Sequence, residues 1–308
     1  MRYAALFPGQ GSQFVGMGAD VFVTRPDLLG ASADSILGWS LSQVCAEGPD
    51  DKLTRTDRAQ PALYAVGYAL WEAFRSAVRQ SPECAAGHSL GEYTALAAGR
   101  AFDFETGLRL VATRGRAMDV AAQAAAGGMA AILGTDHETA ERIAADRRAA
   151  GGRLWVANLN GPGQIVLAGA TEDILWLSEN ARDLGARRAI TLKVAGAFHS
   201  PMMASAAADL AAALEAAEVV EPAFPVWANV SAAGGGEVAA DLTAQLTSTV
   251  RFAETLTSMS ASGVTTFVHI GPGDVTAVMA RRAVPDAHVL TVSTVADVSA
   301  VAAELNVQ

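Results

Sequence analysis

A serine of this 308-residue chain lies in a setting that predicts nucleophilic chemistry, the segment Gly87-His88-Ser89-Leu90-Gly91. The pattern G-x-S-x-G places its serine on a sharp turn between a strand and a helix, with the hydroxyl exposed. An apolar run, ECAA at 83–86, precedes the turn, and the helical run TALAAG follows it. We therefore expect Ser89 at a helix N-terminus, where backbone N–H groups can stabilise an oxyanion.

A serine hydroxyl becomes a good nucleophile only when a nearby base takes its proton. Histidine is the usual base, and the chain offers five: His88, His137, His199, His269 and His288. We expect His88 to point away from the hydroxyl and to form part of the pocket wall. His199, in the small-residue turn GAFHSPM, fits the rim of a site, whereas His269 fits a buried core position in an apolar strand. The other two fit surface loops.

The elements that must position these residues indicate an α/β fold. YAALF at 3–7 and TTFVHI at 265–270 read as strands, and apolar residues recur at helical spacing over 60–78. We predict a large α/β-hydrolase-like catalytic subdomain, residues 1–123 and 195–308, with a parallel-sheet core and a nucleophile elbow at Ser89.

The segment 124–194 shows a different order of elements. It reads as strand, helix, two strands around an Asn/Gly/Pro turn, helix and strand: GGMAAILG, ETAERIAADRRAA, LWVANLNGPGQIVLAG, TEDILWLSENARDLG and RRAITLKV. This β-α-β-β-α-β order is the ferredoxin-like pattern. We predict that it forms a small inserted subdomain.

Composition and charge exclude several classes of protein. The net charge of -10 argues against a nucleic-acid surface, which requires a basic stripe. Cys45 and Cys84 show no metal-ligand spacing and fit buried thiols, so we expect no metal. An apolar run of membrane-spanning length and a secretory leader are both missing, so we expect a cytoplasmic protein that does not bind membranes.

Seven motifs in order resemble malonyl-CoA:acyl carrier protein transacylases over nearly the whole chain. They are FPGQGSQ at 7–13, QPAL at 60–63, GHSLGEY at 87–93, TRGRAM at 113–118, ANLNGPGQ at 157–164, GAFHSPM at 196–202 and GPG at 271–273. The N-terminal part, through GHSLGEYTALAAGRAFDFETGL, looks closest to the discrete, trans-acting acyltransferases of polyketide assembly lines, although fatty-acid enzymes share most of it.

The resemblance implies roles for residues that the G-x-S-x-G pattern alone does not assign. Ser89 would be the nucleophile, and His199 the general base and then the general acid. The backbone carbonyl of Gln245 would orient His199, with no carboxylate in the arrangement. Gln10 and Leu90 would supply the N–H groups of the oxyanion hole.

The resemblance also implies a substrate. Arg114 would bind the free carboxylate of a malonyl group through two parallel hydrogen bonds, although a helix-surface arginine is the alternative reading. Phe198 would fill the space that a 2-methyl substituent needs, which favours malonyl; one methyl group gives only about 1–3 kcal/mol of discrimination. Gln60, Asn158 and Asn160 are either pocket residues or amides that stabilise turns.

The chain departs from the family pattern at Lys193, Ala195, His269 and the glycine-rich segment 234–237. These departures affect substrate choice more than reaction type. The implied reaction is a ping-pong transfer of malonyl from malonyl-CoA to the phosphopantetheine thiol of an acyl carrier protein, in polyketide or fatty-acid biosynthesis. It needs no tightly bound cofactor, and we expect a monomer.

The carrier protein is expected to be acidic and to dock on basic side chains. Candidate docking patches are Arg147/Arg148, Arg187/Arg188 with Lys193, and Arg281/Arg282. Two alternatives remain open. One is a hydrolase of acyl thioesters; a true α/β-hydrolase would use His269 or His288 as its base. The other is a non-catalytic scaffold that binds coenzyme A or carrier proteins.

Overall fold

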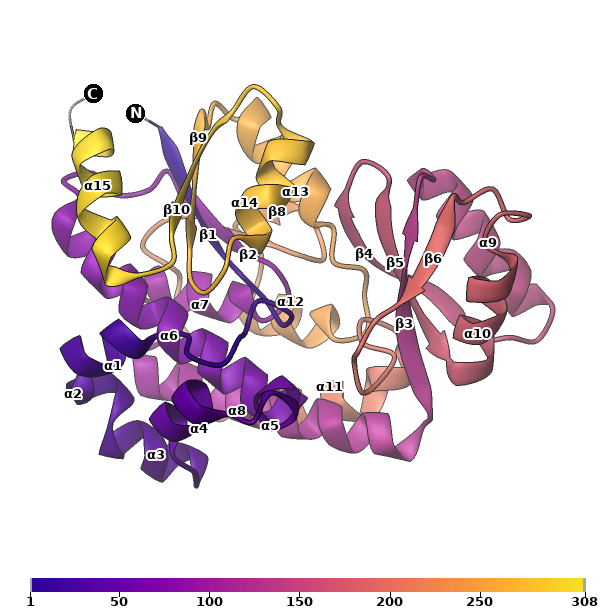
Figure 1. The fold of residues 1–308 in the computed structure, drawn as a ribbon, viewed down its shortest axis with the longest axis horizontal. Helices are drawn as coiled ribbons and strands as arrows, with labels where there is room; N and C mark the ends of the chain where they lie inside the picture. The colour runs from indigo at the N-terminus through magenta and orange to yellow at the C-terminus, as the bar shows by residue number, and fades with distance from the viewer. Residues whose placement is uncertain (1, 307–308) are drawn as a thin grey trace.

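The computed structural model describes residues 2–306, and its larger part is built on a mostly parallel sheet (Figure 1). Within these residues the strand order is β10-β9-β1-β2-β7-β8; β8 is antiparallel to β7 and the other neighbours are parallel. The bounds are β1 (Tyr3–Phe7), β2 (Cys84–Gly87), β7 (Val226–Ala228), β8 (Ala233–Gly234), β9 (Thr266–Ile270) and β10 (His288–Val292). Every residue of β1 and β2 is buried, because helices cover both faces of the sheet.

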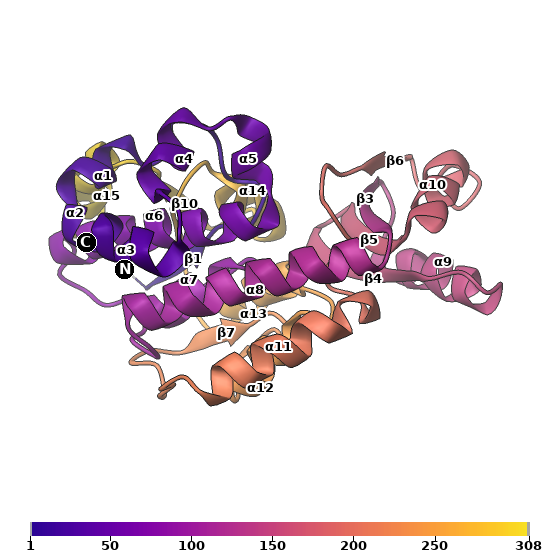
Figure 2. The ribbon, with the colours of Figure 1, turned by 90° about the horizontal axis from the view of Figure 1, so that it is seen from below.

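Two long helices, α6 and α8, pack against each other beside this sheet, and α8 extends toward the smaller part of the molecule (Figure 2). The chain therefore connects its two parts through a continuous rigid element. The helices of the larger part are α1 (Ala19–Thr24), α2 (Pro26–Leu29), α3 (Ala31–Leu37), α4 (Leu41–Glu47), α5 (Asp50–Thr54), α6 (Thr56–Ala77), α7 (Gly91–Ala98), α8 (Phe104–Ala124), the 3-10 turn η1 (Pro201–Met203), α11 (Ala204–Glu215), α12 (Val238–Gln245), α13 (Phe252–Ala261), α14 (Val275–Ala283) and α15 (Val295–Asn306).

The smaller part is an antiparallel sheet with the order β4-β5-β3-β6, packed against α9 and α10 (Figure 1). Its elements are β3 (Gly127–Leu133), α9 (His137–Ala149), β4 (Leu154–Gly161), β5 (Gln164–Ala170), α10 (Thr171–Asn180) and β6 (Arg188–Thr191). This is the predicted β-α-β-β-α-β order, and the ferredoxin-like subdomain is confirmed.

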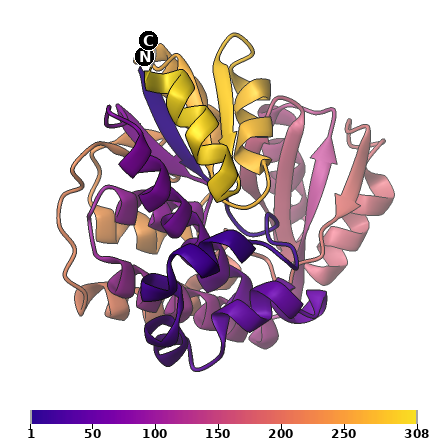
Figure 3. The same ribbon diagram turned by 60° about the vertical axis from the view of Figure 1, so that its left-hand side comes forward.

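The middle of β3 is buried on both faces of the small sheet, whereas the edge strand β6 is largely exposed. Successive residues of a strand point to opposite faces. In β3, Ala130 and Ile132 pack into a separate core with α9 and α10. Met129 and Ala131 join the main core of the larger part instead. β4 also lies against α13 and α14 (Figure 3). The two parts thus share a packed interface.

A pair of backbone hydrogen bonds, forming an isolated β-bridge, joins the smaller part to the larger part at this interface. Leu159 N–H donates to Val250 O at 2.9 Å, and Val250 N–H donates to Ala157 O at 2.8 Å. This bridge fixes the residues around Asn158 relative to α12 and α13. The division into a large subdomain, 1–123 and 195–308, and a small one, 124–194, stays a prediction. The large subdomain as predicted includes Met1, Val307 and Gln308, which lie outside the described residues.

Most predicted elements are present with shifted ends. The helix predicted over 60–78 begins earlier, at Thr56, and the strand predicted over 187–194 ends at Thr191. β6 pairs with β3 only over Arg188–Thr191 before the chain turns toward His199. Among residues 2–306, no helix combines the length and apolar character needed to cross a membrane.

Candidate active site

The turn between β2 and α7 forms the predicted nucleophile elbow. Ser89 has a positive φ of 50°, a strained conformation that appears at functional turns. A Cβ at Gly87 would clash with the backbone of Gly91, and a Cβ at Gly91 would clash with the carbonyl oxygen of Phe7 in β1. The two glycines are therefore required by the close approach of three backbone segments, which confirms the interpretation of the motif.

Ser89 and His199, 110 residues apart in sequence, meet in a buried hydrogen bond of 2.8 Å between Oγ and Nε2. The other ring nitrogen, Nδ1, donates to the backbone carbonyl of Gln245 at 2.8 Å. Because a carbonyl only accepts, Nδ1 carries the hydrogen and Nε2 is free to accept one from Ser89. Burial, followed by the nearby charge of Arg114, lowers the pKa of His199 to about 3. The imidazole is therefore neutral, as a general base must be.

Arg114 is buried in α8 and directed at the same serine. It donates from Nη2 to Ser89 Oγ at 3.0 Å and to Gln245 Oε1 at 2.9 Å, and from Nη1 to Gln60 Oε1 at 2.7 Å. Only 1% of Arg114 is exposed, and burial lowers its pKa. All three acceptors are uncharged, so among the described residues no anion contacts the guanidinium, which could pair with a ligand carboxylate. The alternative of a helix-surface arginine is wrong.

The turn that contains Gln10 packs directly against the elbow. A Cβ at Gly9 would clash with the carbonyl oxygen of His88, so the glycine permits this approach. Within residues 2–306, the backbone N–H groups of Gln10 and Leu90 donate no hydrogen bond. Two unpaired donors from separate turns beside a nucleophilic serine could stabilise an oxyanion.

A cavity of about 370 Å³ opens onto Ser89 and His199. His88 lines it with its ring Nε2 donating to Asn160 Oδ1 at 2.8 Å, and burial lowers the pKa of His88. Leu90 and Gln245 do not line the cavity, but the other residues expected to form the site do, together with Lys193: Gln10, Gln60, Arg114, Asn158, Asn160 and Phe198. These residues therefore converge on one site. A larger cavity, of about 1180 Å³, lies elsewhere and contains neither residue of the Ser89–His199 pair.

Two buried residues that the sequence analysis did not single out support the site from behind. Asn229 follows β7; its Oδ1 accepts from Ser89 N–H at 2.7 Å and its Nδ2 donates to Gly87 O at 2.7 Å. Glu92, in α7, accepts from Asn229 N–H at 2.9 Å and from Gln245 Nε2 at 2.7 Å. Glu92 belongs to the motif GHSLGEY, so the sequence could have indicated its importance, whereas Asn229 lies in none of the seven motifs.

The remaining histidines do not contact the serine. His269 is buried in β9, where its ring nitrogens bond Thr276 Oγ1 at 2.6 Å and Gly271 O at 3.0 Å. His288 begins β10 and pairs with Glu304, and His137 begins α9, so the expectation that these two lie in surface loops is wrong. The arrangement expected of a true α/β-hydrolase, with His269 or His288 as the base, is also wrong. No group of three His, Cys, Asp or Glu side chains within residues 2–306 could hold a metal ion.

The parallel sheet, the elbow and the carboxylate-free Ser–His pair define an acyl-transferring enzyme. In agreement, the family described as acyl transferase domain matches residues 5–301. The malonyl CoA-acyl carrier protein transacylase of Bacillus subtilis is 41% identical over 286 residues, covering 91% of this chain and 90% of the relative. The polyketide biosynthesis protein ThaF of Burkholderia thailandensis is 41% identical over 285 residues, which are 92% of this chain but 24% of ThaF.

Solved structures agree with the sequence matches. The acyl carrier protein S-malonyltransferase of Vibrio cholerae aligns with a TM-score of 0.92 at 36% identity, covering 98% of this chain and all of that one. A malonyl-transacylase in complex with a type II polyketide synthase acyl-carrier protein aligns with a TM-score of 0.93 at 34% identity, covering 99% of this chain and all of that one. The chain belongs to the malonyl-CoA:acyl carrier protein transacylase family.

Proposed function

We propose that this protein transfers a malonyl group from malonyl-CoA, through Ser89, to the phosphopantetheine thiol of an acyl carrier protein. The observation that carries the proposal is the buried Ser89–His199 pair with the Arg114 guanidinium 3.0 Å from the same hydroxyl. The names of the full-length relatives support the same acyl group and acceptor. The pathway served is polyketide or fatty-acid biosynthesis, since a relative named for polyketide biosynthesis and a malonyl CoA-acyl carrier protein transacylase named for no pathway are equally similar.

Acylation begins when Ser89 Oγ attacks the thioester carbonyl while His199 Nε2 takes the hydroxyl proton. The negative charge that develops on the carbonyl oxygen is stabilised by the N–H groups of Gln10 and Leu90. The carbon–sulfur bond then breaks, and His199 returns the proton to the sulfur of coenzyme A. The Gln245 carbonyl keeps the imidazole in the required tautomer and stabilises the imidazolium that forms transiently.

The second half of the reaction runs in the opposite direction. The carrier thiol gives its proton to His199 Nε2 and attacks the ester carbon of malonyl-Ser89. The ester bond breaks, and His199 reprotonates Ser89 Oγ. Atoms and charges balance without a cofactor, and malonyl-CoA enters only as substrate.

Arg114 selects the acyl group by pairing with the free malonyl carboxylate. The charge-assisted pair also fixes the orientation of the ester carbon, which favours the carrier thiol over water. Gln60, His88, Asn158 and Asn160 line the cavity as positioning groups. Phe198 lies on the same wall, where it would crowd a 2-substituent.

The carrier docks on the patch Arg187/Arg188 with Lys193. These side chains are exposed, and Lys193 lines the cavity that opens onto Ser89. In the alternative patches, Arg147 pairs with Asp173, Arg148 bonds the Leu154 carbonyl and Arg282 bonds Gln164, so their guanidinium groups are already engaged. A cytoplasmic location and a monomeric state complete the proposal.

The test is intact-mass analysis of the enzyme with malonyl-CoA or acetyl-CoA, with and without a holo carrier protein. A malonyl adduct that requires Ser89 and moves to the carrier is expected. Arg114→Ala should lower malonyl adduct formation about 100-fold or more, because two charge-assisted bonds are lost, and acetyl much less. Release of free malonate with no loaded carrier would favour the second candidate, a thioester hydrolase built on the same Ser89–His199 pair.

A further inference from the structure

The buried carboxylate of Glu92 takes no part in the reaction described above. Only 2% of the residue is exposed, and within residues 2–306 its carboxylate accepts hydrogen bonds from two neutral donors, Asn229 N–H and Gln245 Nε2. Burial raises the pKa of Glu92 to about 7, because its negative charge is poorly solvated. A carboxylate in such surroundings destabilises the fold unless its contacts are worth more than its desolvation.

Glu92 is the nearest of three oxygen acceptors that face the side-chain NH₂ group of Gln245. The Gln245 Nε2 group donates to Glu92 at 2.7 Å, to the Ser89 carbonyl at 3.1 Å and to Asn229 Oδ1 at 3.4 Å. All three oxygens accept hydrogen bonds, so the NH₂ end of the amide must face them. The oxygen end, Oε1, is thereby turned toward Arg114 Nη2, 2.9 Å away. With the amide reversed, NH₂ would face the guanidinium, donor against donor.

Gln60, the other amide that bonds Arg114, has no comparably strong acceptor for its own NH₂ group within residues 2–306. It accepts from Arg114 Nη1 through Oε1, but its NH₂ group donates only to the thioether sulfur of Met118, a weak acceptor, at 3.3 Å. The orientation of the guanidinium therefore depends mainly on Gln245, and that of Gln245 on Glu92.

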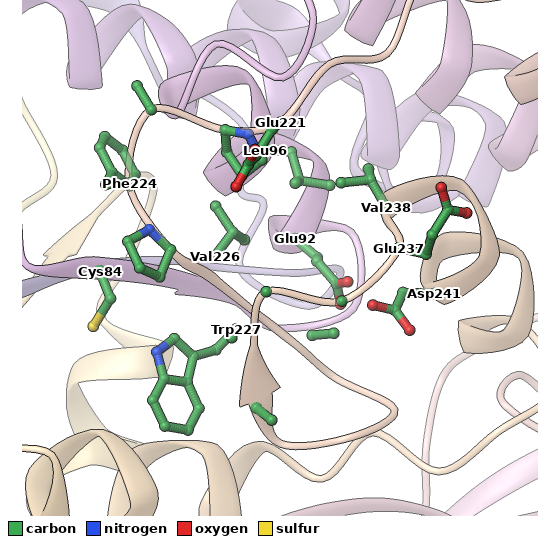
Figure 4. A pocket seen from close by; sticks show the side chains of 18 of the residues that line it. Cys84, Glu92, Leu96, Glu221, Phe224, Val226, Trp227, Glu237, Val238 and Asp241 are labelled. Carbon is green, nitrogen blue, oxygen red and sulfur yellow. The ribbon is translucent and has the colours of Figure 1, made fainter.

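We propose that Glu92 is a positioning residue for acyl-group selection, which acts through the Gln245 amide to aim the Arg114 guanidinium at the substrate carboxylate. The inference rests on the proposed role of Arg114. Glu92 lies on the far side of this network from the substrate: its side chain reaches the large cavity that Glu237 and Asp241 also line (Figure 4). It therefore touches neither substrate nor Ser89 Oγ and acts only through its neighbours.

The acceptor oxygen, rather than the negative charge, is what the Gln245 amide requires. A single oxygen of Glu92, Oε2, accepts from both Asn229 and Gln245. The carbonyl oxygen of a glutamine could occupy the same place and accept both bonds, whereas a leucine of similar size could accept neither. Glu92→Gln and Glu92→Leu thus separate the two possibilities.

The experiment measures single-turnover acylation of Ser89 by malonyl-CoA and by acetyl-CoA. In Glu92→Leu we expect malonyl acylation to fall about 10- to 100-fold more than acetyl acylation, the scale of one hydrogen bond to a charged group. Glu92→Gln should keep the malonyl preference within about threefold of wild type. The matched control is Glu237→Leu, the same substitution at another glutamate of the same cavity that does not bond Gln245. Its malonyl preference should equal that of wild type.

Gln245→Leu provides an independent measurement, because it removes the amide but leaves the backbone carbonyl that holds His199. It should lower the malonyl preference like Glu92→Leu, and the double variant should lower it no further. Equal losses for both substrates in Glu92→Leu, or an unchanged preference in Gln245→Leu, would overturn the inference; the second result decides if Glu92→Leu does not fold. An unchanged preference in Arg114→Ala would instead overturn the proposed function.

Discussion

Asn229 connects the two ends of the nucleophile elbow, and its removal should weaken both the fold and the reaction. The residue is fully buried, and its side chain satisfies Ser89 N–H and Gly87 O at 2.7 Å each. The substitution Asn229→Ala leaves one donor and one acceptor without partners in the interior. Each unsatisfied group costs about 1–3 kcal/mol. The free energy of unfolding should therefore fall by about 2–6 kcal/mol.

The chain contains a control with the same bonding but different surroundings. Asn306 also joins two backbone groups, accepting from Arg79 N–H at 2.9 Å and donating to Ala77 O at 3.0 Å, but both bonds are exposed. Water can replace the lost bonds in Asn306→Ala, so we expect a loss below about 1 kcal/mol. Comparing the two variants isolates the effect of burial.

The assay is urea unfolding followed by circular dichroism, combined with single-turnover acylation. Asn229 makes no contact with Arg114, and its bond to the Gln245 amide, 3.4 Å between Oδ1 and Nε2, is the longest of the three that this NH₂ group donates. The main effect is therefore on the backbone of Ser89, and acylation should fall alike for malonyl-CoA and acetyl-CoA. A free energy of unfolding for Asn229→Ala within about 0.5 kcal/mol of wild type would refute the reasoning. So would an equal loss in Asn306→Ala, since burial would then not matter.

Three further predictions follow from the site and its surroundings. The pKa of His199 is about 3 in the fold, against about 6.5 when unfolded, so the unfolded chain binds this proton first as pH falls. His199 alone should therefore lower the free energy of unfolding by about 2 kcal/mol between pH 7.5 and pH 5, and His199→Gln should show that much less pH dependence than wild type in urea titrations. Gly91→Ala should destabilise the fold by about 2 kcal/mol or more and slow acylation, because the new Cβ meets a backbone carbonyl of β1. The control is Gly128→Ala, whose Cβ has no neighbour closer than 4.0 Å and which should do neither. Equal melting curves for the two variants would contradict this prediction. Arg188→Glu should raise KM for the carrier without changing Ser89 acylation by malonyl-CoA, with Arg281→Glu as the control; an unchanged KM would move the docking site elsewhere.

Local patterns in the sequence were sufficient for the elements and for the nucleophile. YAALF predicted β1 with its observed bounds, and the order of elements over 124–194 predicted the ferredoxin-like sheet, because side-chain periodicity reports on neighbours one or two turns away. G-x-S-x-G located Ser89 for a similar reason, since the close backbone approach at Gly87 and Gly91 is a local requirement. The ends of elements were less predictable: β6 stops where its pairing with β3 stops, and pairing is not local.

The sequence by itself therefore determined the family, the order of the elements and which serine could react, all of which depend on short-range spacing or on ordered motifs. The resemblance assigned His199 as the base in advance, but only the tertiary structure showed its contact with Ser89, how deeply Arg114 is buried, and that Asn229 and Glu92 support the site from the side opposite the substrate. These contacts join residues from 25 to 156 positions apart, and no local pattern records such pairs. They arise because α7, α8 and α12 pack together at the end of one buried sheet, where each unpaired polar group must find a partner.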